Sequence, residues 1–197
     1  SDPPLRKETS VAYILGINGS PHHDKQSTVV WLLEKVLKGA QDAGAEIEVV
    51  HPYRHRIEFT PGLYSIDPAL EAVEHMPPDD MQEIYPKVSR ADGLVFATPN
   101  YWGQMSGAMK NFIDRLTPME NGYHLTGKIA AFVACSKENH GGTESAIMSM
   151  VNCLIQMGVI IPPYSVLWYP SSMASVGKME EEWAVTDAPF VGANMVR

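Results

Sequence analysis

The sequence is poor in cysteine, in basic residues and in long apolar segments, and each shortage excludes a class of protein. Its two cysteines, Cys135 and Cys153, form no C-x-x-C pair and no metal-ligand spacing, which argues for a reducing cytoplasm and against a disulfide framework. Lysine and arginine number 15 against 23 acidic residues, so the net charge of −8 argues against nucleic acid or an anionic membrane as a partner. No apolar stretch approaches the length that spans a membrane, and no secretory signal is visible.

Two common phosphate-binding motifs are missing as well. The chain has no G-x-x-x-x-G-K-[ST], which serves a triphosphate, and no G-x-G-x-x-G, which serves a dinucleotide pyrophosphate.

At 197 residues and 45% apolar content the chain is long enough for one globular domain with a sizeable core. We therefore expect a single domain over residues 1–197, with a flexible N-terminal segment over residues 1–10.

Strand-like segments occur at five places along the chain. Three continuous apolar runs, Val11–Ile17, Gly93–Ala97 and Ile129–Cys135, are typical of parallel strands covered on both faces. Ala45–Val50 alternates instead, as a strand nearer a sheet edge does. Val159–Trp168 predicts a last strand, and the two prolines inside it place that strand at an edge.

Between these runs, apolar residues recur at the spacing of one helix face. The segments are residues 33–40, 81–88, 109–116 and 146–157, and a fifth helix is expected to begin near Asp187, an acceptable N-cap. The alternation predicts five βα units in a doubly wound α/β fold. Ligands of such folds bind at the carboxyl ends of the strands, so the loops that follow the strands are the candidate sites.

The loop after the first strand, residues 18–28 (the first loop), joins Asn18-Gly-Ser-Pro21 to Ser27-Thr28 at a helix start. The free N–H groups of a first helical turn and the helix dipole favour a phosphate, and Ser20, Ser27 and Thr28 add hydroxyl donors. This combination suits a single phosphomonoester, such as that of flavin mononucleotide (FMN). The alternative is a Ser/Pro turn that only joins strand to helix.

Two later loops also have features typical of ligand contact. Residues 98–107 (the second loop) place Tyr101 and Trp102 in a turn after the strand has ended, where their rings can stack on a flat heteroaromatic ligand. The alternative is packing under a neighbouring loop or at a dimer contact. Residues 136–142 (the third loop) end in Gly141-Gly142, which lets backbone approach a ligand closely.

The order of these motifs resembles that of a known family. The motifs are Gly19-Ser-Pro21, Ser27-Thr28, Ala91-Asp-Gly93, Thr98-Pro-Asn-Tyr-Trp-Gly103 and Lys110-Asn-Phe-Ile-Asp-Arg115. From about residue 11 to its C-terminus the chain resembles the flavodoxin-like, NADPH-dependent FMN reductases. The resemblance implies a five-stranded parallel sheet of order 2-1-3-4-5, an FMN cofactor, NAD(P)H as co-substrate, and a homodimer or homotetramer. Hydride would pass to FMN and electrons then to a small-molecule acceptor: a quinone, a nitro or azo compound, a flavin or a ferric chelate.

The family pattern also implies individual contacts. Phosphate contacts are implied for Ser20, Ser27 and Thr28, with Pro21 and Gln26 lining the same loop. Isoalloxazine contacts are implied for Pro99, Asn100, Tyr101, Trp102 and Gly103, with Ser136, Gly141 and Gly142 closing the far edge. No catalytic acid or base is implied, because the flavin carries the chemistry.

The long connection from His51 to Asp79 carries neither cysteines nor a metal-ligand pattern. Some members of the resembled family have a cysteine cluster in the matching region, so we expect no iron–sulfur centre here, and no other metal site. Arg54 and Arg56 are expected to be solvated, the alternative being contact with nicotinamide-cofactor phosphates. Two rival functions stay open: a flavodoxin-type electron carrier, and a non-catalytic protein on the same fold.

Overall fold

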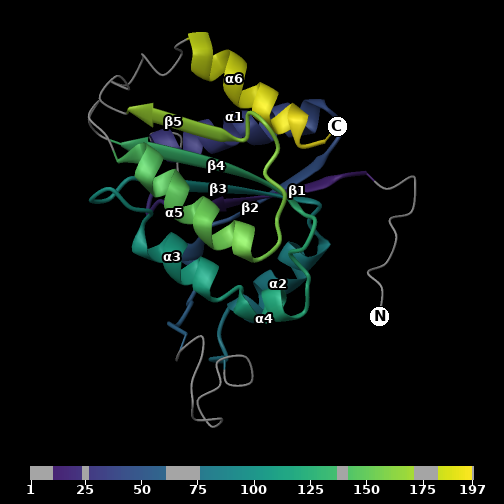
Figure 1. Ribbon diagram of the computed structural model, residues 1–197, viewed down its shortest axis with the longest axis vertical. Coiled ribbons are helices and arrows are strands. Elements are labelled where there is room, and N and C mark those ends of the chain that lie inside the picture. The colour runs from purple at the N-terminus through teal and green to yellow at the C-terminus, as the bar shows by residue number, and fades with distance from the viewer. Residues whose placement is uncertain (1–10, 24–26, 61–75, 137–141, 171–181, 197) are drawn as a thin grey trace.

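A computed structural model describes residues 11–23, 27–60, 76–136, 142–170 and 182–196, and in them a sheet runs through the middle of the molecule with helices on both sides (Figure 1). In chain order the elements are β1 (Tyr13–Asn18), α1 (Thr28–Asp42), β2 (Glu46–Val50), the 3-10 helix η1 (Pro52–Arg54), α2 (Met81–Arg90), β3 (Gly93–Pro99), α3 (Gly107–Asp114), α4 (Thr117–Asn121), β4 (Ile129–Ser136), α5 (Thr143–Gln156), β5 (Val166–Pro170) and α6 (Glu182–Asn194). The segment predicted to be flexible, residues 1–10, lies outside the described residues.

All neighbouring strands are parallel, and their order across the sheet is β2-β1-β3-β4-β5. This order is that of flavodoxin-like sheets, and the predicted flavodoxin-like α/β fold is confirmed. The chain moves from β1 outward to β2 and then back across β1 to β3. The carboxyl ends of β1 and β3 therefore flank the switch point, where such folds bind their ligands.

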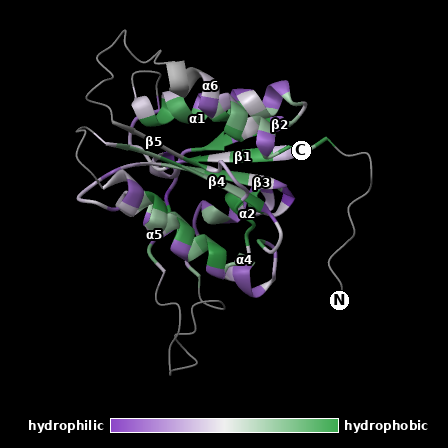
Figure 2. Ribbon diagram, turned by 45° about the horizontal axis from the view of Figure 1, so that its top comes forward, coloured by the Kyte–Doolittle hydropathy of each residue, from purple (hydrophilic) through white to green (hydrophobic). Residues whose placement is uncertain are grey.

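The two faces of the sheet pack against different helices, because successive side chains of a strand point to opposite faces. In β1, Tyr13, Leu15 and Ile17 pack into the cluster that includes α2, α3 and α5, while Ile14 packs with α1 and α6. Figure 2 shows the same division, with hydrophobic helix faces turned toward the sheet and hydrophilic faces turned outward. The sheet is thus buried on both sides, as its continuous apolar strands predicted.

The helices α1 and α6 lie against each other on one face of the sheet (Figure 1). Their backbones approach so closely that a Cβ added at Gly39 would lie 1.9 Å from the carbonyl oxygen of Pro189. The prediction that this last helix begins near Asp187 is wrong, because α6 begins at Glu182. The five residues from Glu182 to Thr186 contain no glycine or proline, so nothing stops the helix before it reaches Asp187.

The last strand also differs from its predicted bounds. Ile160 forms only an isolated parallel bridge to Ile129, and the ladder of β5 begins at Val166. Pro162 and Pro163 lie between these two positions, and proline has no N–H to donate to a neighbouring strand. The prolines therefore precede β5, which begins only at Val166, rather than lie within it.

Candidate functional site

The three loops predicted to contact a ligand meet at the carboxyl edge of the sheet. The ends of adjacent strands lie within two residues of one another: Asn18, the last residue of β1, is opposite Ala97, and Pro99, the last residue of β3, is opposite Cys135. A cavity of about 440 Å³ lies at this edge. It is lined by Ser20, His22, Ser27, Thr28 and Val29 from the first loop and α1, by Pro99, Asn100 and Tyr101 from the second loop, and by Cys135 and Ser136 from the end of β4.

The first loop presents hydroxyl groups and a helix N-terminus to this cavity. Ser27 is the N-cap of α1, and its Oγ accepts a hydrogen bond from the N–H of Val30. The N–H groups of Thr28 and Val29 have no acceptor within the helix, because a first turn has none. The buried Ser20 places its Oγ 3.4 Å from the Oγ of Ser27. Donors and the positive end of the α1 dipole thus converge, which is the arrangement that holds a phosphate.

Asn18, at the end of β1, supports this loop from beneath and was not among the predicted site residues. Its fully buried amide accepts a hydrogen bond from the Ser20 N–H at 3.0 Å and donates to the His22 carbonyl at 2.8 Å. The loop is also joined to α3, since the Ser106 hydroxyl donates to the Gly19 carbonyl at 2.6 Å. The sequence signal for this role was an asparagine directly after the apolar run Val11–Ile17.

The second loop turns back on itself at Trp102 and Gly103. Tyr101 and Gln104 exchange both backbone hydrogen bonds, at 2.9 and 3.0 Å, around these two residues. Both have left-handed backbone, with φ of +55° at Trp102 and +77° at Gly103, as in a type I′ turn. Glycine adopts this conformation freely, whereas a tryptophan there costs about 1 kcal/mol. The indole is fully exposed, so none of the residues that the structure describes packs over it.

The second and third loops contact each other through Gly142. Its φ is +94°, and an added Cβ would lie 2.5 Å from Asn100 Nδ2 and 3.1 Å from Gly103 Cα. The backbone N–H of Asn100 donates to the Cys135 carbonyl at 2.6 Å, which fixes the second loop to the end of β4. Only glycine fits at position 142 while the two loops lie this close.

The structure brings most of the predicted site residues together. Those that line the cavity are Ser20, Ser27, Thr28, Pro99, Asn100, Tyr101 and Ser136. Pro21, Trp102, Gly103 and Gly142 belong to the same loops but do not line the cavity. Gln26 and Gly141 lie outside the described residues. The contacts of all these residues with a cofactor remain predictions.

The cavity wall offers no activated nucleophile among its described residues. Complete burial strongly raises the pKa of the Cys135 thiol, so this cysteine is protonated at neutral pH and does not act as a thiolate. Among the described residues, no group of three or more His, Cys, Asp or Glu side chains is arranged to hold a metal ion. The wall provides hydrogen-bond donors and ring surfaces, which are means of binding rather than of covalent catalysis.

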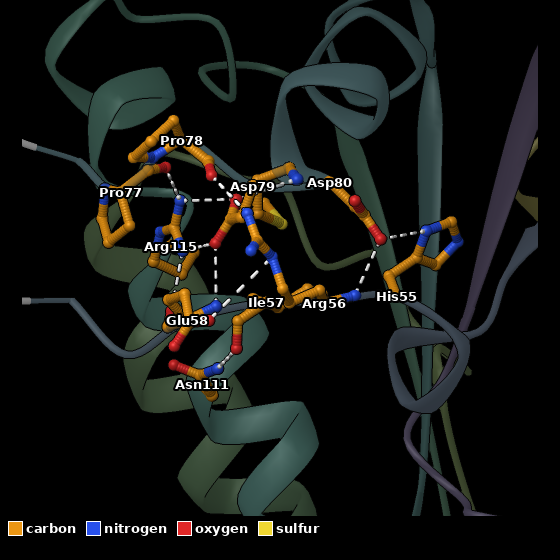
Figure 3. A network of polar contacts seen from close by, with 11 residues as sticks. His55, Arg56, Ile57, Glu58, Pro77, Pro78, Asp79, Asp80, Asn111 and Arg115 are labelled. Carbon is orange, nitrogen blue, oxygen red and sulfur yellow. Dashed lines mark hydrogen bonds and ion pairs between the residues drawn. The ribbon is translucent and has the colours of Figure 1, made fainter.

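Sequence reasoning also missed a buried ion pair that joins the connection after β2 to α3 (Figure 3). Arg115, at the C-terminal end of α3, has no exposed side-chain surface and pairs with both carboxylate oxygens of Asp79. The same guanidinium donates to the Glu58 carbonyl at 2.7 Å and to the Pro77 carbonyl at 3.2 Å. Residues 57–58 and 77–79 are therefore held side by side against one helix.

Around this pair, further contacts complete the network in Figure 3. Asn111 donates to the Ile57 carbonyl at 2.9 Å, and Arg56 donates to the Pro78 carbonyl at 2.7 Å. Arg56 is otherwise largely exposed, which agrees with its expected solvation. Burial raises the pKa of Tyr53 in η1, and electrostatic repulsion from Tyr101 in the second loop raises this pKa further.

Comparison with known proteins identifies the family of the chain. The sequence model of the NADPH-dependent FMN reductase family matches residues 12–170. An iron-sulfur flavoprotein of Archaeoglobus fulgidus is 32% identical over 158 residues, which cover 80% of this chain and 74% of the relative. An NAD(P)H dehydrogenase (quinone) of the same organism is 29% identical over 170 residues, covering 81% of this chain and 85% of the relative.

The first relative is named as an iron–sulfur flavoprotein. This chain has two cysteines, fewer than the four that commonly ligate an iron–sulfur cluster. Among solved structures, RosB with a bound 8-demethyl-8-formylriboflavin-5′-phosphate intermediate aligns with a TM-score of 0.73. It is 20% identical, with 95% of this chain and 79% of RosB covered, which supports the fold alone.

None of the helices that the structure describes combines the length and apolar character needed to cross a bilayer. Its sequence, its parallel sheet and its converging loops establish that this chain belongs to the NADPH-dependent FMN reductase family, the FMN-dependent oxidoreductases that use NAD(P)H.

Proposed function

We propose that the cavity at the carboxyl edge of the sheet binds FMN, with its phosphate at the first loop and its isoalloxazine ring beside the second. The observation that carries this proposal is that described residues of the first loop, of the second loop and of the end of β4 line one cavity next to the β1/β3 switch point. Ser20, Ser27 and the first turn of α1 provide donors for one phosphate. The absence of a pyrophosphate motif favours FMN over a dinucleotide flavin.

In this proposal the residues of the chain bind and orient the cofactor. Bound FMN supplies the redox chemistry, taking up hydride from NAD(P)H and passing electrons to a second substrate. Asn100, held by the Cys135 carbonyl, and the backbone around Gly103 and Gly142 provide polar groups for the rim of the ring. No side chain needs to act as an acid or base, because the cofactor carries the reaction.

For the second substrate we propose a planar aromatic acceptor, a quinone first among them. Trp102 is fully exposed and Tyr101 and Tyr53 are about half exposed, so ring surface is available beside the cavity for stacking. The relative named NAD(P)H dehydrogenase (quinone) supports the same substrate class. Nitro and azo compounds share this planar shape, whereas a ferric chelate or a free flavin would use the same open face.

Replacing Trp102 with alanine tests the stacking role. We expect Trp102→Ala to slow reoxidation by a bulky quinone about tenfold, the size of one lost ring contact. Reduction by NADPH should change less, and both half-reactions can be followed by stopped flow at the flavin absorbance. Tyr123→Ala is the matched control, because Tyr123 is also exposed with left-handed backbone, φ +57°, but lies outside the three loops. Equal rates in Trp102→Ala and Tyr123→Ala would contradict the stacking role and would favour a dimer contact for Trp102.

The wider assignments follow from the same account. We propose that the chain acts as one FMN-binding domain in the cytoplasm, which the free thiols of Cys135 and Cys153 support. We propose a homodimer or homotetramer, supported by exposed apolar side chains on α5, Met148 and Ile155. Light scattering on the purified protein measures the oligomeric state, and a monomer at micromolar concentration would contradict this part.

A further inference from the structure

The hydrogen bonds of the Asn18 amide determine its orientation beneath the first loop. Oδ1 accepts from the backbone N–H of Ser20 at 3.0 Å, and Nδ2 donates to the backbone carbonyl of His22 at 2.8 Å. A backbone N–H only donates and a carbonyl only accepts, so these two partners fix which amide atom is oxygen and which is nitrogen. The remaining N–H of the amide is then available for a third partner.

That third partner is the imidazole of His51, the residue directly after β2. Asn18 Nδ2 lies 3.0 Å from His51 Nδ1. Because the amide nitrogen has only hydrogens to offer, Nδ1 must be the acceptor, and His51 carries its single proton on Nε2. The contact therefore exists only while His51 is neutral.

The surroundings of His51 favour the neutral form. Burial lowers the pKa of the imidazole from its ordinary value of 6.5, and the positive charges of Arg54, His23 and His55 lower it further. Arg54 and His55 belong to the η1 turn and His23 to the first loop, so positive groups face His51 from both segments. At neutral pH the imidazole is uncharged and available to Asn18.

We propose that His51 is a positioning residue for phosphate binding: neutral His51 holds Asn18, and through it the first loop, in the shape that receives the FMN phosphate. Protonation places a hydrogen on His51 Nδ1, which then faces the N–H of Asn18 Nδ2 as a second donor. The third hydrogen bond of Asn18 is thereby lost. Asn18, which holds the Ser20 and His22 backbone groups, then loses one of the contacts that fix its own position. This inference rests on the proposed function, because it takes the first loop as the phosphate site.

Simple electrostatics predicts the opposite pH effect. An imidazolium near a phosphate attracts it, so a His51 that contacts the ligand directly would strengthen FMN binding in acid. A His51 that acts through Asn18 weakens it. The sign of the pH effect attributable to His51 therefore separates the two roles.

The experiment compares wild type with His51→Asn, which keeps an acceptor oxygen at the same δ position but does not titrate. Apoprotein is titrated with FMN by flavin fluorescence between about pH 5 and 8. We expect the ratio of the wild-type Kd to the His51→Asn Kd to be near one at the alkaline end. Toward acid it should rise about three- to tenfold, as for one lost hydrogen bond. The FMN phosphate itself titrates near pH 6, but this cancels in the ratio.

Three controls keep the result decisive. His51→Ala lacks the acceptor and should bind FMN weakly at every pH, and His51→Gln serves as a second acceptor that does not titrate. Riboflavin, which has no phosphate, should show a flat ratio. A ratio that stays near one, or falls below one toward acid, overturns the positioning role. If wild type at pH 8 binds FMN no more tightly than riboflavin, the phosphate site itself fails, which is a separate outcome.

Discussion

Ser20 and Thr28 line the cavity with neutral hydroxyl groups rather than with charged side chains. Among the residues that the structure describes, the cavity wall holds no lysine or arginine, and the phosphate donors described there are hydroxyl and backbone groups. Hydrogen bonds to a charged group are each worth about 1.5–3 kcal/mol, roughly twice a neutral one. The affinity for a phosphate should accordingly depend strongly on a few side chains.

We expect the double change Ser20→Ala and Thr28→Ala to weaken FMN binding by a few kcal/mol, about 1.5–3 kcal/mol for each lost bond. Riboflavin affinity should change little, and both ligands can be measured by fluorescence titration of the apoprotein. A similar loss for both flavins would show that these residues act through the stability of the loop.

Gly142 allows a second prediction at the level of single residues. Gly142→Ala forces a side chain into left-handed backbone and against Asn100, so it should weaken FMN binding and lower the melting temperature. Gly127→Ala is the matched control, because Gly127 has a similar φ of +80° with no atom within 4 Å of an added Cβ. The excess effect at Gly142, measured by thermal unfolding and FMN titration, reports the collision alone, and equal effects would contradict the close contact of the two loops.

Residue types with local partners were predictable from sequence, and those with distant partners were not. Ser27 and Ser106 cap helices that begin at the next residue, so sequence alone places them. Arg115 has the appearance of a surface residue on a helix, because its partner Asp79 is 36 positions away along the chain. Asn18 shows the same limit, since its contact with His51 spans 33 positions.

Among the elements, those with a long periodic pattern were predicted, whereas two short helices that begin with proline were not. The buried strands β1, β3 and β4 and the amphipathic helices α1, α3 and α5 follow directly from hydrophobic spacing. Both short helices, η1 and α4, have proline in their first turn, and neither is long enough to show a period. We infer that tertiary packing determines where these two short helices form.

The connection between β2 and α2 depends on the Arg115–Asp79 pair, which provides a prediction at the level of elements. Arg115→Met leaves a buried carboxylate unpaired and should lower the free energy of unfolding by about 3–5 kcal/mol. Lys110→Met is the control, because its pair with Asp114 on the same helix is partly exposed and is worth at most about 0.5 kcal/mol. Urea unfolding at pH 7 measures both, and equal losses would contradict a structural role for the buried pair.

The same pair makes the free energy of unfolding depend on pH in acid. Burial by itself raises the pKa of Asp79, but hydrogen bonds from Arg115 and from the Glu58 and Met81 N–H groups together bring it below its usual range. Stability from this carboxylate is thus present above the unfolded pKa of about 3.9 and is lost as pH falls through the lower folded pKa. Asp79→Asn should flatten the fall in unfolding free energy below about pH 4, whereas an unchanged slope would assign the acid transition to other carboxylates.

The molecule as a whole combines a sheet buried on both faces with three loops that meet at one edge, and its central property is FMN-dependent electron transfer. The most direct test is the visible spectrum of purified protein loaded with FMN, recorded without oxygen before and after NADPH and then after a quinone. We predict that the yellow flavin band is retained through gel filtration, disappears with NADPH and returns with the quinone. Protein that retains no FMN, or that retains FMN which NADPH does not bleach, would contradict the account.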